Sequence, residues 1–283
     1  MKKIILLIMF YALTGIAFPQ DFNNLKINDF KKLNSITKNV NPIDSKKVKQ
    51  KDISFTINPY LWLIAAGGTL SIPNIPSGYP QYYDFSKSVS DGLKNMKFAF
   101  MVGGKLKYKK VSFYYDVVYI NLKNFGATVP EGSGLNSANT TNKEFITDLS
   151  IGYDVHKGKT SFVDLYAGAR IWALKSEITL IPSDKGLSNE MLSSNSSWVD
   201  PIVGVNAKFL MGKKWFSYIR SDFGGFGVSS SWNFMMLGGF GYDLNPNWNT
   251  TLGLKYLGLD YDKDKTRWNV NQYGILISLG YRY

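Results

Sequence analysis

The chain has 283 residues, enough for one large domain or two small ones. Hydrophobic residues make up 45% of it, aromatic residues make up 15%, and glycine occurs 26 times, whereas cysteine is absent. This composition favours β-hairpins over helical packing and excludes a fold that depends on disulfides. The formal net charge is +12, but the export signal described next makes nucleic acid a poor explanation for that excess.

The first 52 residues predict two segments that precede the folded part. Residues 1–20 carry two lysines, then an apolar run from Ile4 to Leu13, then small residues, which is the form of a secretory signal peptide. The apolar run is too short for a comfortable transmembrane helix. Residues 21–52 are rich in lysine and asparagine, which predicts a flexible periplasmic arm. A short amphipathic helix that plugs or caps the following domain is the alternative for this arm.

Ten strand candidates follow in residues 53–283. Their approximate bounds are Ile53 to Ile72, Met96 to Lys109, Val111 to Phe125, Lys143 to Val155, Thr160 to Ile181, Trp198 to Leu210, Trp215 to Gly224, Ser231 to Tyr242, Trp248 to Tyr261, and Val270 to Tyr283. A single-chain bacterial barrel with both ends in the periplasm requires an even number of strands. The sequence therefore predicts an all-β fold, a single antiparallel up-and-down transmembrane β-barrel of about ten strands.

The connections between these strands alternate in length. Four are tight turns, at residues 109–110, 155–159, 211–214 and 243–247. The others are mostly longer and polar, at residues 73–95, 126–142, 182–197, 225–230 and 262–269. Outer-membrane barrels have short periplasmic turns and longer outer loops, so a periplasmic C-terminus would place every longer loop outside.

The two faces of the strands differ in chemistry, because successive side chains of a strand point to opposite faces. In the fourth candidate strand, Phe145, Leu149 and Ile151 lie on one face, while Asp148 and Gly152 lie on the other. Charges share a face with glycine and serine in the other strands as well. A soluble barrel would place its charges in water, so the pattern predicts an apolar face towards lipid and a polar lumen.

Eleven charged residues are predicted to face this lumen. They are Lys105, Asp116, Asp148, Asp164, Arg170, Asp200, Lys208, Arg220, Asp222, Lys255 and Arg282. They could form an ion-pair network that seals a narrow barrel, or they could line a water-filled pathway and set its ion selectivity. On the first reading, Arg170 and Arg220 are expected to pair with Asp164, Asp200 and Asp222, because the five residues share a face on consecutive strands.

Aromatic residues mark two further candidate sites. Those near strand ends predict an aromatic girdle at the two membrane surfaces: Trp198, Trp215, Trp232, Trp248, Tyr242, Tyr281 and Tyr283. Those in the first outer loop predict a surface that contacts a ligand: Tyr79, Tyr82, Tyr83 and Phe85. This loop could equally fold back and plug the mouth of the barrel.

The last candidate strand carries a resemblance to a known class of proteins. Residues Val270 to Tyr283 have a continuous apolar face and end on an aromatic residue. This strand resembles the closing strand of bacterial outer-membrane β-barrels, which is read by the barrel-assembly machinery. The segments Trp198 to Gly204 and Gly224 to Gly227 are similar to blocks of uncharacterised proteins of this class, and the Asn- and Lys-rich composition resembles that of Bacteroidetes proteins. The resemblance implies the outer membrane of a Gram-negative bacterium, with lipopolysaccharide and phospholipid as lipid partners.

The histidine content argues against catalysis. The chain has one histidine, His156, in a predicted periplasmic turn, and no cysteine. The known outer-membrane barrel enzymes, the omptin proteases, phospholipase A and the lipid A deacylases, use a histidine near the outer rim or facing lipid. His156 is predicted at the opposite end, so the resemblance to these enzymes fails at this residue. We therefore expect no enzyme, no cofactor and no metal, and no pattern specifies an oligomeric state.

The sequence patterns are compatible with three functions. The leading hypothesis is a structural barrel or a narrow passive pore with a charged lumen. The alternative is a surface module that binds a small apolar or amphipathic ligand through its outer loops. A lipid-modifying barrel enzyme is the third.

Overall fold

The computed structural model of the chain describes residues 53–71, 82–123, 131–184, 186, 188–263 and 265–283. By its contacts the chain divides into two units, Met1–Gln50 and Lys51–Tyr283. The predicted signal peptide (1–20) and arm (21–52) lie outside the described residues. The described part is almost entirely strand, and no helix in it is long and apolar enough to cross a membrane.

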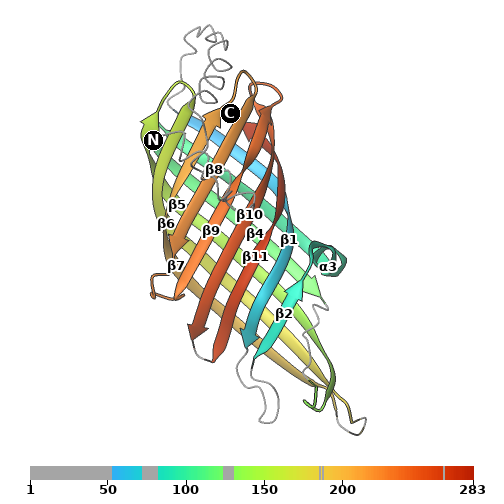
Figure 1. The fold of residues 1–283 in the computed structure, drawn as a ribbon. Coiled ribbons are helices and arrows are strands. Elements are labelled where there is room, and N and C mark those ends of the chain that lie inside the picture. The colour runs from blue at the N-terminus through green and yellow to red at the C-terminus, as the bar shows by residue number, and fades with distance from the viewer. Residues whose placement is uncertain (1–52, 72–81, 124–130, 185, 187, 264) are drawn as a thin grey trace, which may run out of the picture. The chain divides into compact units, whose positions relative to one another are not determined.

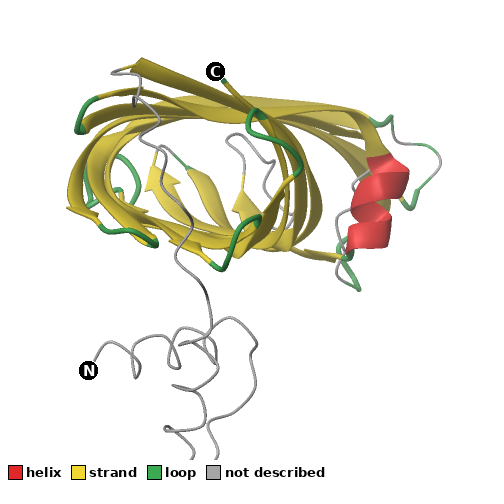
Figure 2. Cartoon of the chain, turned by 90° about the horizontal axis from the view of Figure 1, so that it is seen from above, coloured by secondary structure: helices red, strands yellow, loops and turns green. Residues whose placement is uncertain are grey.

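The described residues form a closed antiparallel ring of strands (Figures 1 and 2). The elements are β1 (Ile53–Ser71), β2 (Tyr83–Lys87), α3 (Val89–Asn95), β3 (Met96–Tyr108), β4 (Val111–Lys123), β5 (Leu135–Lys157), β6 (Ser161–Pro182), β7 (Glu190–Leu210), β8 (Trp215–Gly224), β9 (Trp232–Asp243), β10 (Trp248–Lys263) and β11 (Thr266–Arg282). From β3 onward each strand pairs with the next, β1 pairs with β3, and β11 pairs with β1 to close the ring. Of the eleven strands of the sheet, β2 alone is outside the ring and pairs with β1. The predicted up-and-down barrel of about ten strands is therefore confirmed.

The barrel has a turn end and a loop end. The turn end carries the four tight turns, β3 to β4, β5 to β6, β7 to β8 and β9 to β10, together with the last residue, Tyr283. The loop end carries the other connections. At that end the strands are longer than the sequence predicts, because β5 begins at Leu135 and β7 begins at Glu190. The added segments are rich in Asn, Ser and Thr, and they pair through backbone hydrogen bonds, which any side chain permits.

The connection at residues 262–269 also differs from the expected loop. Strands β10 and β11 remain paired as far as Lys263 and Thr266, so this connection is a tight hairpin. Lys265, within the hairpin, has a positive φ of 61°. Asp262, Lys263 and Arg267, which fall within the expected loop, belong to the paired strand ends.

The first outer loop, residues 73–95, contains both β2 and α3, which the sequence did not predict. The helix begins after Ser88, whose hydroxyl accepts a hydrogen bond from the backbone N–H of Asp91. The Asp91 carboxylate in turn accepts from the backbone N–H of Ser88, which completes a capping box. Hydrogen bonds from the Ser88 hydroxyl and backbone hold the pKa of Asp91 below its usual value.

The outer face of the barrel is apolar, whereas the inner face carries charged and polar residues together with a buried apolar cluster, so the predicted polar lumen is only partly correct. The cluster comprises Trp62, Met101, Val118, Ile120, Ile146, Trp172, Leu174, Trp198, Met235, Leu257, Leu259, Tyr261, Trp268 and Val270. Ile151 on β5 is 64% exposed, whereas Asp148 on the same strand is 4% exposed. The exposed large hydrophobic residues include Leu149, Tyr153, Leu165, Val199, Val203, Phe240, Leu252, Leu254, Ile275 and Ile277. Period-two alternation of the strands produces this separation, and its direction is the reverse of that in a water-soluble protein.

Candidate functional site: a polar lumen and a side pocket

Arg170 is the centre of the polar lumen. Its side chain extends inward from β6 and is 1% exposed. The guanidinium donates two hydrogen bonds of 2.7 Å to the carboxylate of Asp148 on β5, the residue opposite it in the strand register. Nη2 also donates to Asp222 on β8 at 3.0 Å, and Nη1 donates to the side-chain oxygen of Asn233 on β9 at 2.9 Å. One side chain thus connects four strands through charge-assisted hydrogen bonds.

A second ion pair crosses the lumen. The Lys255 ammonium on β10 lies 3.0 Å from a carboxylate oxygen of Asp116 on β4 and donates to the hydroxyl of Tyr60 on β1, also at 3.0 Å. The Tyr60 hydroxyl donates to the other Asp116 oxygen at 2.7 Å. Strands β10 and β4 are separated in the ring by β11, β1 and β3. This bridge therefore spans the interior rather than joining neighbouring strands.

A layer of tyrosines and charges lies nearer the turn end. The guanidinium carbon of Arg220 lies 5.4 Å from the ring centroid of Tyr114 and 4.9 Å from that of Tyr166. Arg220 Nε donates to the Tyr166 hydroxyl at 3.1 Å, and that hydroxyl donates to Asp222 at 2.7 Å. The Tyr114 hydroxyl donates to Asp164. The arginine layer and the tyrosine layer are thus joined through Asp222.

Three further predicted lumen charges, Lys105, Lys208 and Arg282, also face inward at this end. Lys105 lies 3.8 Å from Asp164. Lys208 lies 3.5 Å from the ring centroid of Phe216. Arg282 is half-buried, 3.7 Å from Asp243.

Towards the loop end, Asp200 on β7 is fully buried and accepts hydrogen bonds from several neutral donors. The indole N–H groups of Trp172 and Trp198 lie 3.0 and 3.1 Å from one carboxylate oxygen. Asn233 Nδ2 and the Ser230 hydroxyl reach the same oxygen at 2.9 and 2.6 Å, and the Ser230 backbone N–H donates to the other oxygen at 2.9 Å. Asp200 thereby attaches the β8–β9 connection to β7.

The prediction that Trp198 belongs to the aromatic girdle is wrong, because this residue lies inside the barrel. Its side chain is 8% exposed and stacks on Trp172 and Tyr261, with ring centroids 5.7 and 3.9 Å away. Trp198 and Asp200 are two residues apart on one strand, so they must share a face. The sequence pattern that placed Asp200 in the lumen should also have placed Trp198 there.

The other predicted girdle residues lie on the outer face or at the rims. Trp215 and Tyr242 pack at a centroid distance of 4.9 Å at the turn end, and Trp248 and Tyr281 pack at 5.0 Å on the strands that follow. Tyr283 is exposed at the C-terminus. Trp232 is half-buried at the start of β9, at the loop end.

The expected partners of the two arginines are only partly found. Arg170 binds Asp222 as expected, but its main partner is Asp148. Asp200 lies opposite Arg170 in the register with β7, yet its oxygens are occupied by the indole, amide and hydroxyl donors. Arg220 contacts the two tyrosine rings rather than forming an ion pair within 4 Å with a described carboxylate. The sequence shows that these residues share a face but not which pairs meet.

Along its length, strand β1 changes its hydrogen-bonding partner on one side from β3 to β2. The ladder of β1 with β3 ends at Pro59 opposite Val102, and its ladder with β2 begins at Ala66 opposite Lys87. Helix α3 packs on β1 between these two ladders. A Cβ atom at Gly92 of α3 would lie 2.8 Å from the backbone oxygen of Ile64, so this close approach requires glycine. Figure 2 shows α3 on the outer side of the strand wall.

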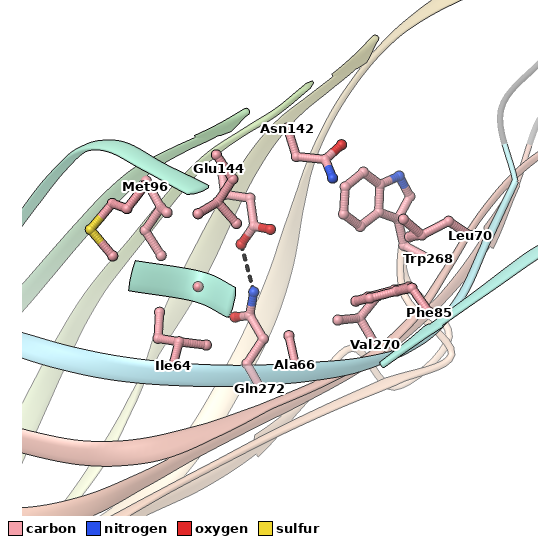
Figure 3. A pocket seen from close by; sticks show the side chains of 13 residues that line it. Ile64, Ala66, Leu70, Phe85, Met96, Asn142, Glu144, Trp268, Val270 and Gln272 are labelled. Carbon is pink, nitrogen blue, oxygen red and sulfur yellow. Dashed lines mark hydrogen bonds between the residues drawn. The ribbon is translucent and has the colours of Figure 1, made fainter. Parts of the chain in front are cut away.

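A side pocket lies behind α3 (Figure 3). Its apolar lining comes from β1, β2, β3, β4 and β11 and comprises Ile64, Ala66, Leu70, Phe85, Met96, Ile120, Leu122, Trp268 and Val270. Its polar lining comprises Asn142, Glu144 and Gln272. Gln272 Nε2 on β11 donates to Glu144 on β5 at 2.6 Å, a contact between strands separated by β1, β3 and β4.

The predicted ligand loop is divided between different environments. Tyr79 lies outside the described residues, and Tyr82 is exposed, with Arg267 5.7 Å from its ring centroid. Tyr83 is buried in a cluster with Leu135, Ala138, Ile178 and Leu180. Phe85 lines the side pocket. The expectation of one aromatic loop surface is therefore wrong for Tyr83, which is buried. Tyr83 and Phe85 are two residues apart on β2, which pairs with β1, so both lie on one face of that strand.

Comparison with known proteins gives a likeness of fold. No protein-family model matches the chain, and no curated protein matches it. In fold, the chain resembles bacterial outer-membrane β-barrel proteins. The outer membrane protease OmpT from Escherichia coli matches with 10% identity and a TM-score of 0.48, over 83% of this chain and 97% of that one. The transport unit of the autotransporter AIDA-I from Escherichia coli matches with 10% identity and a TM-score of 0.39, over 90% of this chain and 97% of that one. Neisserial surface protein A matches with 15% identity and a TM-score of 0.31, over 82% of this chain and 96% of that one.

Proposed function

We propose that the protein is an integral β-barrel of a Gram-negative outer membrane whose lumen is closed, so that it acts as a structural barrel rather than a passive pore. The observation that carries this proposal is the set of bridges between strands that are not neighbours. Arg170 joins β6 to β8 and β9, Lys255 joins β10 to β4, and Gln272 joins β11 to β5. Side chains bonded across the interior occupy the space that a conducting pathway would need.

The outer face supports placement in a membrane. Its exposed residues are long and apolar over much of the ring. The pairs Trp215–Tyr242 and Trp248–Tyr281 lie on adjacent strands at the turn end, where an aromatic girdle would contact headgroups. In this proposal lipopolysaccharide and phospholipid contact the apolar face, and the barrel-assembly machinery recognises β11.

The proposal assigns no catalytic role. His156, the one histidine of the chain, lies next to the β5–β6 turn, with Nε2 2.9 Å from the Ser161 hydroxyl at an exposed position. His156 is therefore at the turn end of the barrel. Asp200 with its hydrogen-bond donors and the side pocket both lie nearer the loop end. No described histidine or cysteine lies at the loop end to serve as a base or nucleophile.

Conductance tests the closed lumen. We expect protein purified from outer membranes and inserted in a planar bilayer to give no steady ohmic steps. The double variant Tyr60→Ala with Lys255→Ala removes one bridge, and we expect it to raise the frequency of conducting events. Leu254→Ala, which alters the exposed neighbour of Lys255, serves as the matched control. Heat-modifiable gel mobility must show that each sample has inserted, and steady steps from inserted wild-type protein would contradict the closed lumen.

A charge on the outer face tests the membrane assignment. Val203 on β7 is 50% exposed and lies between Ala167 and Phe223 of the neighbouring strands. We expect Val203→Arg to lower the free energy of unfolding from lipid vesicles by roughly 2 to 4 kcal/mol, because an arginine near the bilayer midplane is desolvated. Val155→Arg, on the outer face at the turn end, should cost only about 0 to 1 kcal/mol. Equal and negligible costs at both positions would mean that this face does not contact lipid.

A further inference from the structure

The outward side chains of β5 and β6, which are neighbours in the wall (Figure 1), change character at one level of the barrel. On β5 the outward side chains from Val155 to Phe145 are mostly apolar, and on β6 those from Val163 to Ala173 are all apolar. The next outward residue is Lys143 on β5 and Lys175 on β6. The residues on either side of each lysine are buried, so both lysines lie on the outer face.

This level is the outer edge of the apolar band. Ten residues separate Val155 from Phe145, and ten separate Val163 from Ala173. At about 3.3 Å per residue and a strand tilt of about 40°, ten residues rise roughly 25 Å, which is the height of the apolar band of an outer-membrane barrel. With the turn end in the periplasm, Lys143 and Lys175 therefore follow directly after the hydrocarbon of the outer leaflet, at the level of its headgroups.

The strand register places these two cations side by side. Lys143 lies directly opposite Lys175 in the antiparallel ladder of β5 and β6. Like charges at opposite positions of a ladder destabilise the pairing, and an anion between them removes that cost. Glu177 lies 2.8 Å from Lys175 and within electrostatic reach of Lys143. The two cations thus share one carboxylate, and none of the ion pairs among the described residues includes Lys143.

A third lysine belongs to the same outward patch. Lys123, the last residue of β4, is exposed and lies opposite Thr141 of β5, which in turn lies opposite Glu177 of β6. Thr141 is the next outward residue after Lys143, so Lys123 lies one outward row above the two paired lysines. We call Lys123, Lys143 and Lys175 the rim lysines. Their charge exceeds that of the one carboxylate beside them, so the patch is positive.

The opposite side of the ring carries negative charge at the same level. Strand β10 lies five strands from β5 in the ring. Its outward side chains run from Trp248 to Gly258, again over ten residues, and the next outward residues are Asp260 and Asp262. A general attraction to headgroups would place lysines around the whole rim. The restriction of the rim lysines to β4, β5 and β6 instead indicates one bound anionic group.

The surface directly below the rim lysines suits an acyl chain. Phe145, the outward residue below Lys143, is 39% exposed. The rings of Phe98 on β3 and Tyr119 on β4 pack together on the same face, with centroids 5.9 Å apart. An anion held by the rim lysines would therefore have lipid-contacting surface immediately beneath it, which favours a lipid headgroup over a free ion.

We propose that the rim lysines bind a phosphate of one lipopolysaccharide molecule, whose acyl chains lie on the outward apolar side chains of β5 and β6. Lysine ammonium groups bind phosphate through charge-assisted hydrogen bonds. Lipopolysaccharide is the phosphorylated lipid of the outer leaflet, whereas glycerophospholipid forms the inner leaflet. The inference rests on the proposed membrane placement, to which it adds one defined lipid and the residues that hold its phosphate.

Native mass spectrometry of protein purified from outer membranes, in detergent micelles, tests this proposal. The probe is diphosphoryl lipid A. The comparison lipids are the same lipid A with its phosphates removed and phosphatidylglycerol. We expect one lipid A to be retained per barrel, with both comparison lipids binding at least about tenfold more weakly, because a hydrogen bond to a charged group has that value. Equal retention of dephosphorylated lipid A, or retention of phosphatidylglycerol as tightly as lipid A, would overturn the proposal.

Three variants locate the site. Lys143→Gln with Lys175→Gln should weaken lipid A binding by roughly tenfold or more. Glu177→Gln should strengthen it, because this change removes the carboxylate that competes with phosphate for Lys175. Lys213→Gln with Lys214→Gln makes the same change of charge in the exposed β7–β8 turn, at the other end of the barrel, and should leave the affinity unchanged.

These variants also separate the binding site from the membrane placement. Unchanged lipid A affinity in the Lys143→Gln, Lys175→Gln protein with native heat-modifiable mobility would refute the site, even if Val203→Arg destabilises the barrel as expected. An equal loss of affinity in the Lys213→Gln, Lys214→Gln protein would show a general effect of charge, and it would refute the site as well. Failure of the membrane placement itself would instead appear as a Val203→Arg barrel as stable as the wild type.

Discussion

Replacing Arg170 by alanine should lower the free energy of unfolding by about 3 to 5 kcal/mol, the usual cost of removing one partner from a buried ion pair. The guanidinium is the only described cation within 4 Å of Asp148 and Asp222. Its loss leaves two carboxylates inside the barrel without compensation, and it also removes a donor to Asn233. Urea unfolding from lipid vesicles, followed by tryptophan fluorescence, measures this change.

Two controls separate the uncompensated charge from the lost side-chain volume. The triple variant Arg170→Ala, Asp148→Asn, Asp222→Asn removes the carboxylate charges as well, and we expect it to be more stable than Arg170→Ala alone. Arg267→Ala removes a half-exposed arginine 3.7 Å from Asp262, and such a surface pair contributes only about 0 to 1 kcal/mol. A loss in Arg170→Ala no larger than in Arg267→Ala would show that the Arg170 network does not stabilise the barrel.

Replacing Asp200 by alanine should have the second largest effect, a loss of about 2 to 4 kcal/mol, because each buried donor left without an acceptor costs about 1 to 3 kcal/mol. The donors affected are the indoles of Trp172 and Trp198, the amide of Asn233, and the hydroxyl and backbone N–H of Ser230. Water entering the vacated space would satisfy some of them, which keeps the expected loss below the full sum.

The stacked aromatic rings provide a specific readout for this variant. Trp172, Trp198 and Tyr261 stack in a row, and Asp200 holds both indole N–H groups. We expect Asp200→Ala to reduce the near-UV circular dichroism of these rings as well as the unfolding free energy. Asp184→Ala removes an exposed carboxylate that, among the described residues, accepts from the Gly186 N–H, and it should change neither signal. A native near-UV spectrum in Asp200→Ala would mean that packing alone orders the rings.

Local sequence pattern predicts the ten strands of the ring and the apolar chemistry of their outer face. Alternation is a local property, so Phe145, Asp148 and Ile151 reveal their faces without knowledge of their neighbours. The same rule, applied consistently, would have placed Trp198 with Asp200 in the lumen. The Ser88 to Asp91 capping box was likewise present in the sequence as a start signal for α3.

The contacts between side chains across the lumen follow from the tertiary structure and not from local pattern. Arg170 has an inward aspartate opposite it on each side, Asp148 and Asp200, and local pattern cannot distinguish them. The pairing of Lys255 with Asp116 and of Gln272 with Glu144 depends on the closed ring, because these residues are far apart both in sequence and around the sheet. The side pocket likewise exists because β1 exchanges β3 for β2 along its length. A period-two pattern fixes the direction of each side chain, whereas distances across the lumen are set by strand register and ring closure, which are non-local properties.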